Sequence, residues 1–129
     1  MFERIVVGVS KAQSAAEAAR RAIDLAQKFG SELHLVIAFD GTDTGPESAS
    51  RRHAEGTVES IATGYSGKIR THALPDEPVA AILRVADEVG ADLIVVGNKG
   101  MRGAGRVLGS VPNSVAHKAP CSVLIVNTT

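Results

Sequence analysis

The strongest constraint on the fold is a regular alternation between short apolar runs and longer amphipathic segments. The apolar runs are rich in β-branched residues, which is typical of strands buried on both faces of a sheet. These runs cover residues 5–9, 33–39, 69–74, 93–96 and 122–126. The segments between them place apolar residues at helical spacing. Five strands alternating with four helices predict one α/β domain over residues 1–129, a doubly wound parallel sheet with helices on both faces.

Signals at the ends of the predicted helices support this division of the chain. Ser14 and Glu17 fit a capping box at the start of the first helix, and Gly30 suits the left-handed position that ends it. The other three helices are predicted over about 47–63, 78–89 and 110–118. In open parallel sheets, ligands bind outside the carboxyl ends of the strands, where the strand order reverses. The loops after residues 9, 39 and 96 are therefore where we expect a binding site.

Composition and charge exclude several classes of protein. Fourteen basic residues against fourteen acidic ones give a formal net charge of zero, so a basic nucleic-acid-binding surface is not expected. No apolar run approaches the roughly 20 residues that span a bilayer, and the chain opens directly on a strand-like run. The single cysteine, Cys121, excludes an intrachain disulfide and a multi-cysteine metal site. We therefore expect a cytoplasmic protein that binds neither nucleic acid nor membranes.

The loop after the fourth predicted strand has residues suited to binding an anion. Five glycines within residues 97–109 let the backbone approach a ligand closely. The loop leads into a helix at Ser110, whose free N–H groups and dipole favour negative charge, and Lys99, Arg102 and Arg106 add positive charge. These features suit a phosphate chain. They equally suit a tightly turned loop whose glycines only avoid steric clashes.

Two widespread phosphate-binding signatures are absent from the sequence. There is no G-x-x-x-x-G-K-[ST] run, which argues against a P-loop kinase or ATPase. The turn after the first strand reads GVSKA, which does not match the dinucleotide-binding fingerprint expected there. The glycine-rich loop instead follows the fourth strand.

Several stretches are distinctive as a set. They are IVVGVS at 5–10, DEP at 76–78, ADLIVVG at 91–97, G-x-x-G at 97–100, GSV at 109–111 and HKAPCSVLIV at 117–126. Together they resemble the universal stress proteins of the UspA type over essentially the whole chain. The resemblance implies a Rossmann-like parallel sheet of strand order 3-2-1-4-5, in the adenine nucleotide alpha hydrolase-like class.

The same resemblance implies a site for an adenine nucleotide: ATP, AMP or cyclic AMP. The residues it places along the phosphates are Gly97, Gly100, Gly109, Ser110 and Val111. The residues it places around the adenosine are Gly8, Val9, Ser10 and the backbone of Ala38. No catalytic residue and no metal ligand is assigned.

The predicted function is stress response or signalling through a bound nucleotide, without efficient turnover. The glycine loop contains no histidine or carboxylate that could act as a base. The alternative is a dimeric interaction or chaperone-like stress protein whose glycine loop is purely structural. Two features favour the alternative: Ser10 stands where nucleotide-binding members carry aspartate, and eight residues separate Gly100 from Gly109 where their motif has nine.

The last predicted strand, 122–126, would lie at an edge of the sheet in this strand order. An uncovered apolar edge invites pairing with another chain. In the family that it resembles, the corresponding strand often forms the dimer contact, so we expect an isologous homodimer through this strand.

Other reactive side chains are predicted to be structural. His34 and His72 lie within strands, where buried histidines are common, and Cys121 is expected to be an inert packing residue. Asp40 and Asp43 follow the second strand, and we interpret them as turn residues outside the site.

Overall fold

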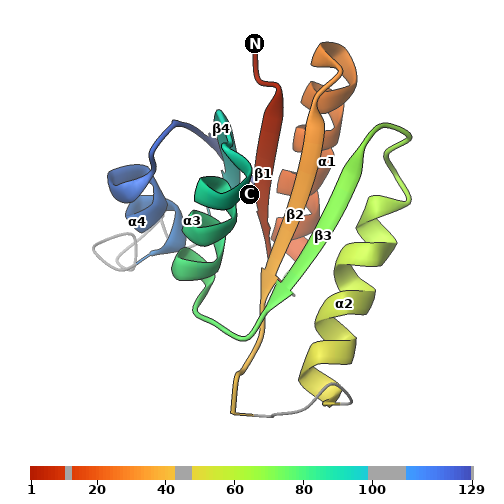
Figure 1. The fold of residues 1–129 in the computed structure, drawn as a ribbon, viewed down its shortest axis with the longest axis vertical. Helices are drawn as coiled ribbons and strands as arrows, with labels where there is room; N and C mark the ends of the chain where they lie inside the picture. The colour runs from red at the N-terminus through yellow and green to blue at the C-terminus, as the bar shows by residue number, and fades with distance from the viewer. Residues whose placement is uncertain (11–12, 43–47, 99–109, 129) are drawn as a thin grey trace.

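The computed structural model of this chain describes residues 1–10, 13–42, 48–98 and 110–128. Its elements alternate as the sequence predicts. In chain order they are β1 (Arg4–Val9), α1 (Gln13–Phe29), β2 (Glu32–Ala38), α2 (Ala49–Ala62), β3 (Ile69–Leu74), α3 (Pro78–Val89), β4 (Leu93–Gly97), α4 (Val111–Lys118) and β5 (Ser122–Val126). The five strands form one parallel sheet of order β3-β2-β1-β4-β5, which confirms the predicted topology (Figure 1).

Helices cover both faces of this sheet (Figure 1). Successive strand residues point to opposite faces, so Val7 packs in the core beneath α1 and α2 while Val6 packs beneath α3 and α4. We call these the α1/α2 face and the α3/α4 face. In β1, β2 and β4, consecutive residues are buried, which explains why these strands read as continuous apolar runs.

The helix ends follow the predicted signals with one exception. Gly30 and Gly90 have φ of 66° and 67°, the left-handed conformation that ends α1 and α3. Ser48 caps α2, where its hydroxyl accepts a hydrogen bond from the Arg51 N–H at 3.1 Å. The predicted cap at Ser14 is wrong, because Gln13, the residue before it, is already part of α1. A three-residue spacing between serine and glutamate does not determine which residue takes the extended conformation that a cap needs.

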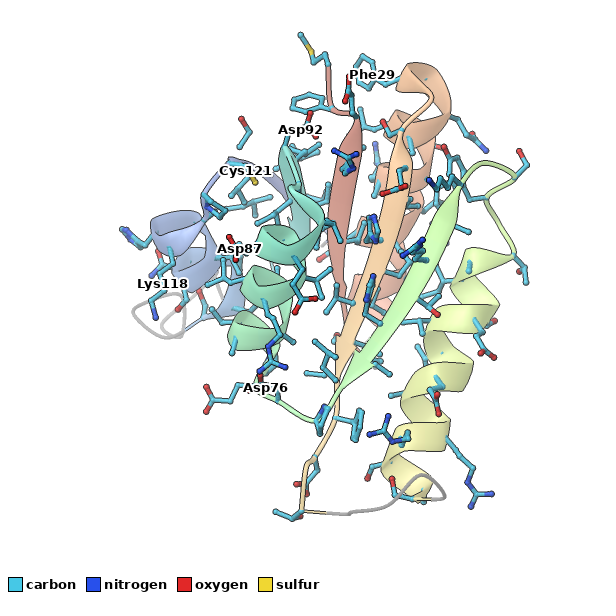
Figure 2. All side chains as sticks on the ribbon, viewed as in Figure 1. Phe29, Asp76, Asp87, Asp92, Lys118 and Cys121 are labelled. Atoms are coloured by element: carbon cyan, nitrogen blue, oxygen red, sulfur yellow. The ribbon has the colours of Figure 1, made fainter. Side chains whose placement is uncertain are left out.

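The two ends of the sheet differ in character. Figure 2 shows Phe29 at the end where the chain enters β1 and Asp76 at the opposite end, where β2 and β3 finish. At the first end, the Asp92 carboxylate accepts hydrogen bonds from the N–H groups of Glu3 and Arg4, at 2.9 and 3.1 Å. These bonds tie the start of β1 to the residue that precedes β4. The predicted binding site lies at the opposite end of the sheet, where β2 and β3 finish.

Candidate functional site

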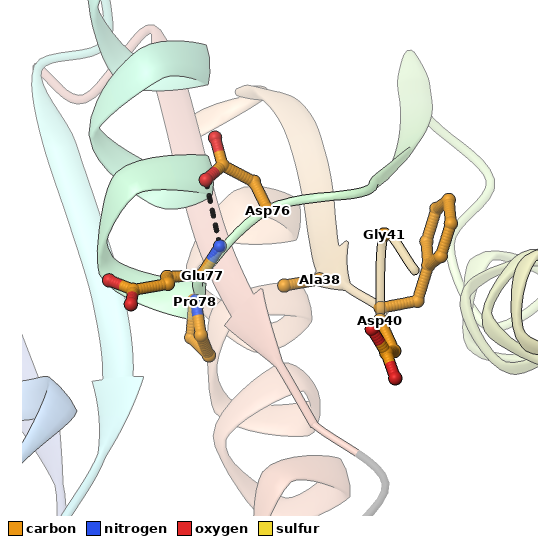
Figure 3. A pocket seen from close by; sticks show the side chains of 7 residues that line it. Ala38, Asp40, Gly41, Asp76, Glu77 and Pro78 are labelled. Atoms are coloured by element: carbon orange, nitrogen blue, oxygen red, sulfur yellow. Dashed lines mark hydrogen bonds between the residues drawn. The ribbon is translucent and has the colours of Figure 1, made fainter. Parts of the chain in front are cut away.

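A pocket of about 560 Å³ opens at the carboxyl ends of β2 and β3, beside the start of α3 (Figure 3). Its volume falls within the range of small-molecule sites. The residues that line it are Ala38, Phe39, Asp40, Gly41, Asp76, Glu77 and Pro78. It therefore occupies the position where the sequence predicts a ligand after the second strand.

Strand pairing creates this pocket from two distant segments. Ala38 at the end of β2 lies opposite Leu74 at the end of β3, so the segments that follow both strands begin side by side. The Leu74 carbonyl accepts hydrogen bonds from the N–H groups of Phe39 and Asp76, both at 2.9 Å. This carbonyl joins the two walls of the pocket. Pro78 then starts α3 and closes one side.

Among the residues that the structure describes, every charged side chain that lines the pocket is a carboxylate. Asp40 accepts hydrogen bonds from the N–H and hydroxyl of Thr42, at 2.9 and 2.8 Å, and these bonds lower its pKa. Asp76 accepts from the Glu77 N–H and from Arg84, both at 2.8 Å. Glu77 caps α3 without a side-chain capping bond. These oxygens accept hydrogen bonds and carry negative charge, so the pocket favours a group with N–H donors and disfavours a phosphate.

The residues predicted along the phosphates are described in part. Gly97 ends β4, and Ser110 caps α4, where its hydroxyl accepts from the Asn113 N–H at 3.3 Å. Val111 is the first residue of α4. Since β4 and β5 are parallel, α4 runs back between them and its N-terminus lies toward the carboxyl ends of the strands. Gly100 and Gly109 lie outside the described residues.

The three predicted site residues at the end of β1 have different roles in the packing. A Cβ on Gly8 would lie 2.6 Å from Cδ1 of Ile82 on α3 and 3.3 Å from Cγ1 of Val96, so this glycine lets α3 approach the sheet. Val9 is buried in the α1/α2 core. Of these three residues, only Ser10 is exposed to solvent.

Six of the seven pocket residues lie outside the predicted site, and three of the six carry carboxylates. The sequence pattern indicates a turn residue at Asp40 and a helix opening at Asp76 and Glu77, yet all three line the pocket. The signal that could have found them is the pairing of β2 with β3, which brings their following loops together. Ala38, whose backbone was predicted to meet adenine, lies in the same wall.

Cys121 lies apart from this pocket, as Figure 2 shows by its distance from Asp76 along the sheet. Burial and, secondarily, the charge of Asp92 raise the pKa of its thiol, which keeps it in the less reactive protonated form. In the four described segments, no group of three or more His, Cys, Asp or Glu side chains could hold a metal ion. Nor does any described helix have the length and apolar character to cross a membrane.

Comparisons with known proteins agree with the fold and with the resemblance. The profile of the universal stress protein family matches residues 1–127. Universal stress protein Rv1636 of Mycobacterium tuberculosis is 34% identical, and the match covers 99% of this chain and 98% of that protein. The chain belongs to the universal stress protein family.

Two solved structures carry nucleotides. A universal stress protein in complex with cAMP is 35% identical, with a TM-score of 0.79, and the match covers 99% of this chain and 98% of that one. The universal stress protein of Archaeoglobus fulgidus in complex with dAMP is 25% identical, with a TM-score of 0.72 and 98% of both chains covered. Adenine nucleotides thus bind to proteins of this fold at these levels of similarity.

Proposed function

We propose that this universal stress protein binds an adenine nucleotide across the carboxyl edge of its sheet. The base would occupy the pocket beside Ala38, and the phosphates would lie on the loop between β4 and α4. The observation that carries the proposal is a pocket at the end of β2 in a chain 35% identical to a universal stress protein crystallised with cAMP. We further propose that the protein acts in the cytoplasm, in stress response or signalling.

The charges in the pocket orient the ligand. Asp40, Asp76 and Glu77 would repel a phosphate but can accept hydrogen bonds from the exocyclic amine of adenine. The opposite end of the nucleotide must then lie toward Gly97 and the N-terminus of α4, where N–H groups and the helix dipole favour an anion. The Ser10 hydroxyl, at the end of the intervening strand β1, can make one hydrogen bond to the ribose.

The proposed activity is binding without efficient turnover. Hydrolysis of a phosphate chain needs a base held near the attacking water. The carboxylates of this site line the base pocket, so they lie at the wrong end of the proposed ligand. We expect the bound nucleotide to act by changing how the protein contacts its partners.

Thermal shifts with ATP, AMP and cyclic AMP test the proposal. A ligand at about 100 times its dissociation constant stabilises a protein by roughly 2.7 kcal/mol. For a domain of this size, that corresponds to an increase in Tm of about 2–8 °C. Gly109→Val, which places a bulky side chain in the proposed phosphate loop, should abolish the shift while the variant keeps its circular dichroism spectrum.

Two outcomes would contradict the proposal in different ways. If the wild type ignores all three nucleotides up to millimolar concentration, the chain does not bind adenine nucleotides, and the alternative of a dimeric interaction protein takes its place. If folded Gly109→Val responds as the wild type does, a nucleotide binds, but its phosphates do not lie on this loop.

We also propose that the protein is a homodimer through β5. This strand is the edge of the sheet beside β4, and Leu124 on it is 38% exposed. Pairing of two such edges around a twofold axis would cover the strand. Sedimentation at micromolar concentration should give the mass of two chains. Leu124→Pro, which removes an N–H donor from the strand, should give monomers; a dimer unaffected by it would place the interface elsewhere.

A further inference from the structure

Two histidines on neighbouring strands form a hydrogen-bonded pair that the proposed nucleotide site does not use. His34 on β2 is 1% exposed, and its Nδ1 lies 3.0 Å from Nε2 of His72 on β3. The centroids of the two rings are 5.2 Å apart. Since Leu33 and Leu35 face the α1/α2 core, His34 between them points to the α3/α4 face. The pair therefore bridges β2 and β3 on that face.

Glu32 determines where the protons of this pair lie. Its Oε2 is 2.7 Å from Nε2 of His34, and its Oε1 is 2.9 Å from Nζ of Lys68. Hydrogen bonds from His34 and then Lys68 lower the pKa of Glu32 to about 2, and Arg4 lies 3.6 Å away. The ionised carboxylate can only accept, so Nε2 of His34 carries a proton and donates it to Glu32.

The space between the two rings can hold one proton. In the neutral pair, Nε2 of His72 donates to Nδ1 of His34. One added proton can occupy the outer Nδ1 of His72 without disturbing this bond. A second added proton would place two N–H groups face to face across 3.0 Å, where neither can accept, and the rings would have to separate.

The surroundings of His72 oppose its protonation. Burial is the largest cause that lowers its pKa below the ordinary value of 6.5, and the charge of His34 follows. Glu88 on α3 raises the pKa of His72, while Arg70 on β3 lowers it further. In an unfolded chain, His72 would leave these surroundings and its pKa would return to about the ordinary 6.5. Stability linked to His72 is therefore present above about pH 6.5 and is lost as the pH falls below it.

The pair is connected to the pocket through β3. This strand is an edge of the sheet, with β2 as its one neighbouring strand. His72 lies two residues before Leu74, whose carbonyl holds both Phe39 and Asp76 through hydrogen bonds of 2.9 Å. A shift of β3 at His72 would thus move the atom that joins the two walls of the pocket.

We propose that the His34–His72 pair is a pH-sensitive latch that holds β3 against β2, and that a second added proton opens it and weakens ligand binding in the pocket. The coupling to a ligand rests on the proposed nucleotide site. The proton chemistry of the latch rests on the histidine pair alone, so the two can fail separately.

The test compares the wild type with His72→Gln. A glutamine amide can donate to Nδ1 of His34 but does not titrate, so this variant keeps the bond and loses the proton sensitivity. His53→Gln, which removes an exposed histidine of α2, is the matched control. Between about pH 7.5 and pH 5.5, the Tm of the wild type and the control should fall by roughly 2–8 °C more than that of His72→Gln.

Binding of adenosine is measured at the same two pH values, because adenosine has no phosphate that titrates in this range. Its dissociation constant should rise about fivefold or more in the wild type and stay nearly constant in His72→Gln. A Tm of His72→Gln that falls as steeply as that of the wild type would overturn the latch. A difference in Tm with no difference in adenosine binding would overturn its coupling to the pocket.

If the wild type binds no adenosine at either pH, the proposed nucleotide site fails, and the latch is still decided by the Tm comparison. The coupling is then read from the backbone amide resonances of Phe39 and Asp76. They should shift between the two pH values in the wild type and remain fixed in His72→Gln. Equal shifts in both proteins would overturn the coupling.

Discussion

The two faces of the sheet differ in what they bury. The α1/α2 face is an apolar core formed by β1, β2 and β4 against both helices. The α3/α4 face contains Gly8, over which Ile82 packs closely, and His34, the one buried polar residue within the described strands. Many of its apolar residues are half-buried, Leu83 and Val123 among them. We call the first the sealed face, because most of its clustered residues are fully buried, and the second the thinner face, because most of its clustered residues are only partly buried.

This difference indicates that folding stability and ligand binding depend mainly on different faces of the sheet. Apolar burial stabilises a fold in proportion to the area removed from water, so the sealed face, with more fully buried apolar residues, contributes more than the other. The pocket lies at the carboxyl end of β2, where α3 begins on the thinner face, and the histidine pair lies on the same face. Groups that bind or titrate are tolerated there because the core beneath α1 and α2 does not depend on them.

The largest effect expected from the comparison is a difference between two leucines. Leu35 is fully buried on the sealed face, and Leu35→Ala should lower the free energy of unfolding by about 2–5 kcal/mol. Leu83 on α3 is half-buried, so Leu83→Ala removes less contact and should cost clearly less. Urea denaturation of both variants measures their free energies of unfolding. Equal losses would show that the two faces are equally well packed.

A smaller effect is expected from two glycines. Gly8→Ala adds a Cβ that lies 2.6 Å from Ile82, and overpacking of this kind costs about 1–3 kcal/mol. Gly56 lies in α2 with no atom within 4 Å of an added Cβ, so Gly56→Ala should instead stabilise the protein by about 0.5–1 kcal/mol. Thermal unfolding of both variants measures these two changes in stability. A neutral Gly8→Ala would mean that α3 can move away from the sheet at little cost.

The smallest expected effect is on the stability of the protein in acid, through Glu32, which contacts His34 of the histidine pair. The pKa of Glu32 is lowered from 4.5 to about 2, so its contribution is complete above about pH 4.5 and is lost as the pH falls toward 2. Glu32→Gln should flatten the fall of Tm in that window. Its partners Lys68 and Arg4 are well exposed, which keeps the effect small. If the Tm of Glu32→Gln falls with pH as the wild-type Tm does, Glu32 makes no such contribution to stability.

The sequence predicts the fold well because most elements are defined locally. The strands β3 and β5 have the predicted bounds, β1 and β4 each extend one residue further at one end, and β2 is shifted by one residue toward the N-terminus. The β-branched runs and the terminal glycines Gly30 and Gly90 determine the backbone conformation within a few residues of their own positions. The predicted cap of α1 is wrong because residue spacing alone does not set the backbone conformation at Ser14.

The site and the histidine pair depend on which strands are neighbours and in what register. In the pairing of β2 with β3, His34 lies opposite Arg70, and His72 lies opposite Val36, so the two rings meet diagonally. No local pattern reveals this contact. The sequence does not predict Asp40 as a site residue, because the pocket also needs Asp76, which is distant in sequence and reaches the same pocket through the paired strand ends.

The most direct test of the nucleotide site maps where AMP binds. Backbone amide resonances of the isotope-labelled protein are followed during an AMP titration. We expect the amides of Ala38, Asp40 and Glu77 at the pocket to shift in a saturable way, while those of Ala54 and Val58, buried on the α1/α2 face, do not. Pocket amides that stay fixed at millimolar AMP, or shifts confined to α2, would contradict a nucleotide site at the carboxyl edge of the sheet.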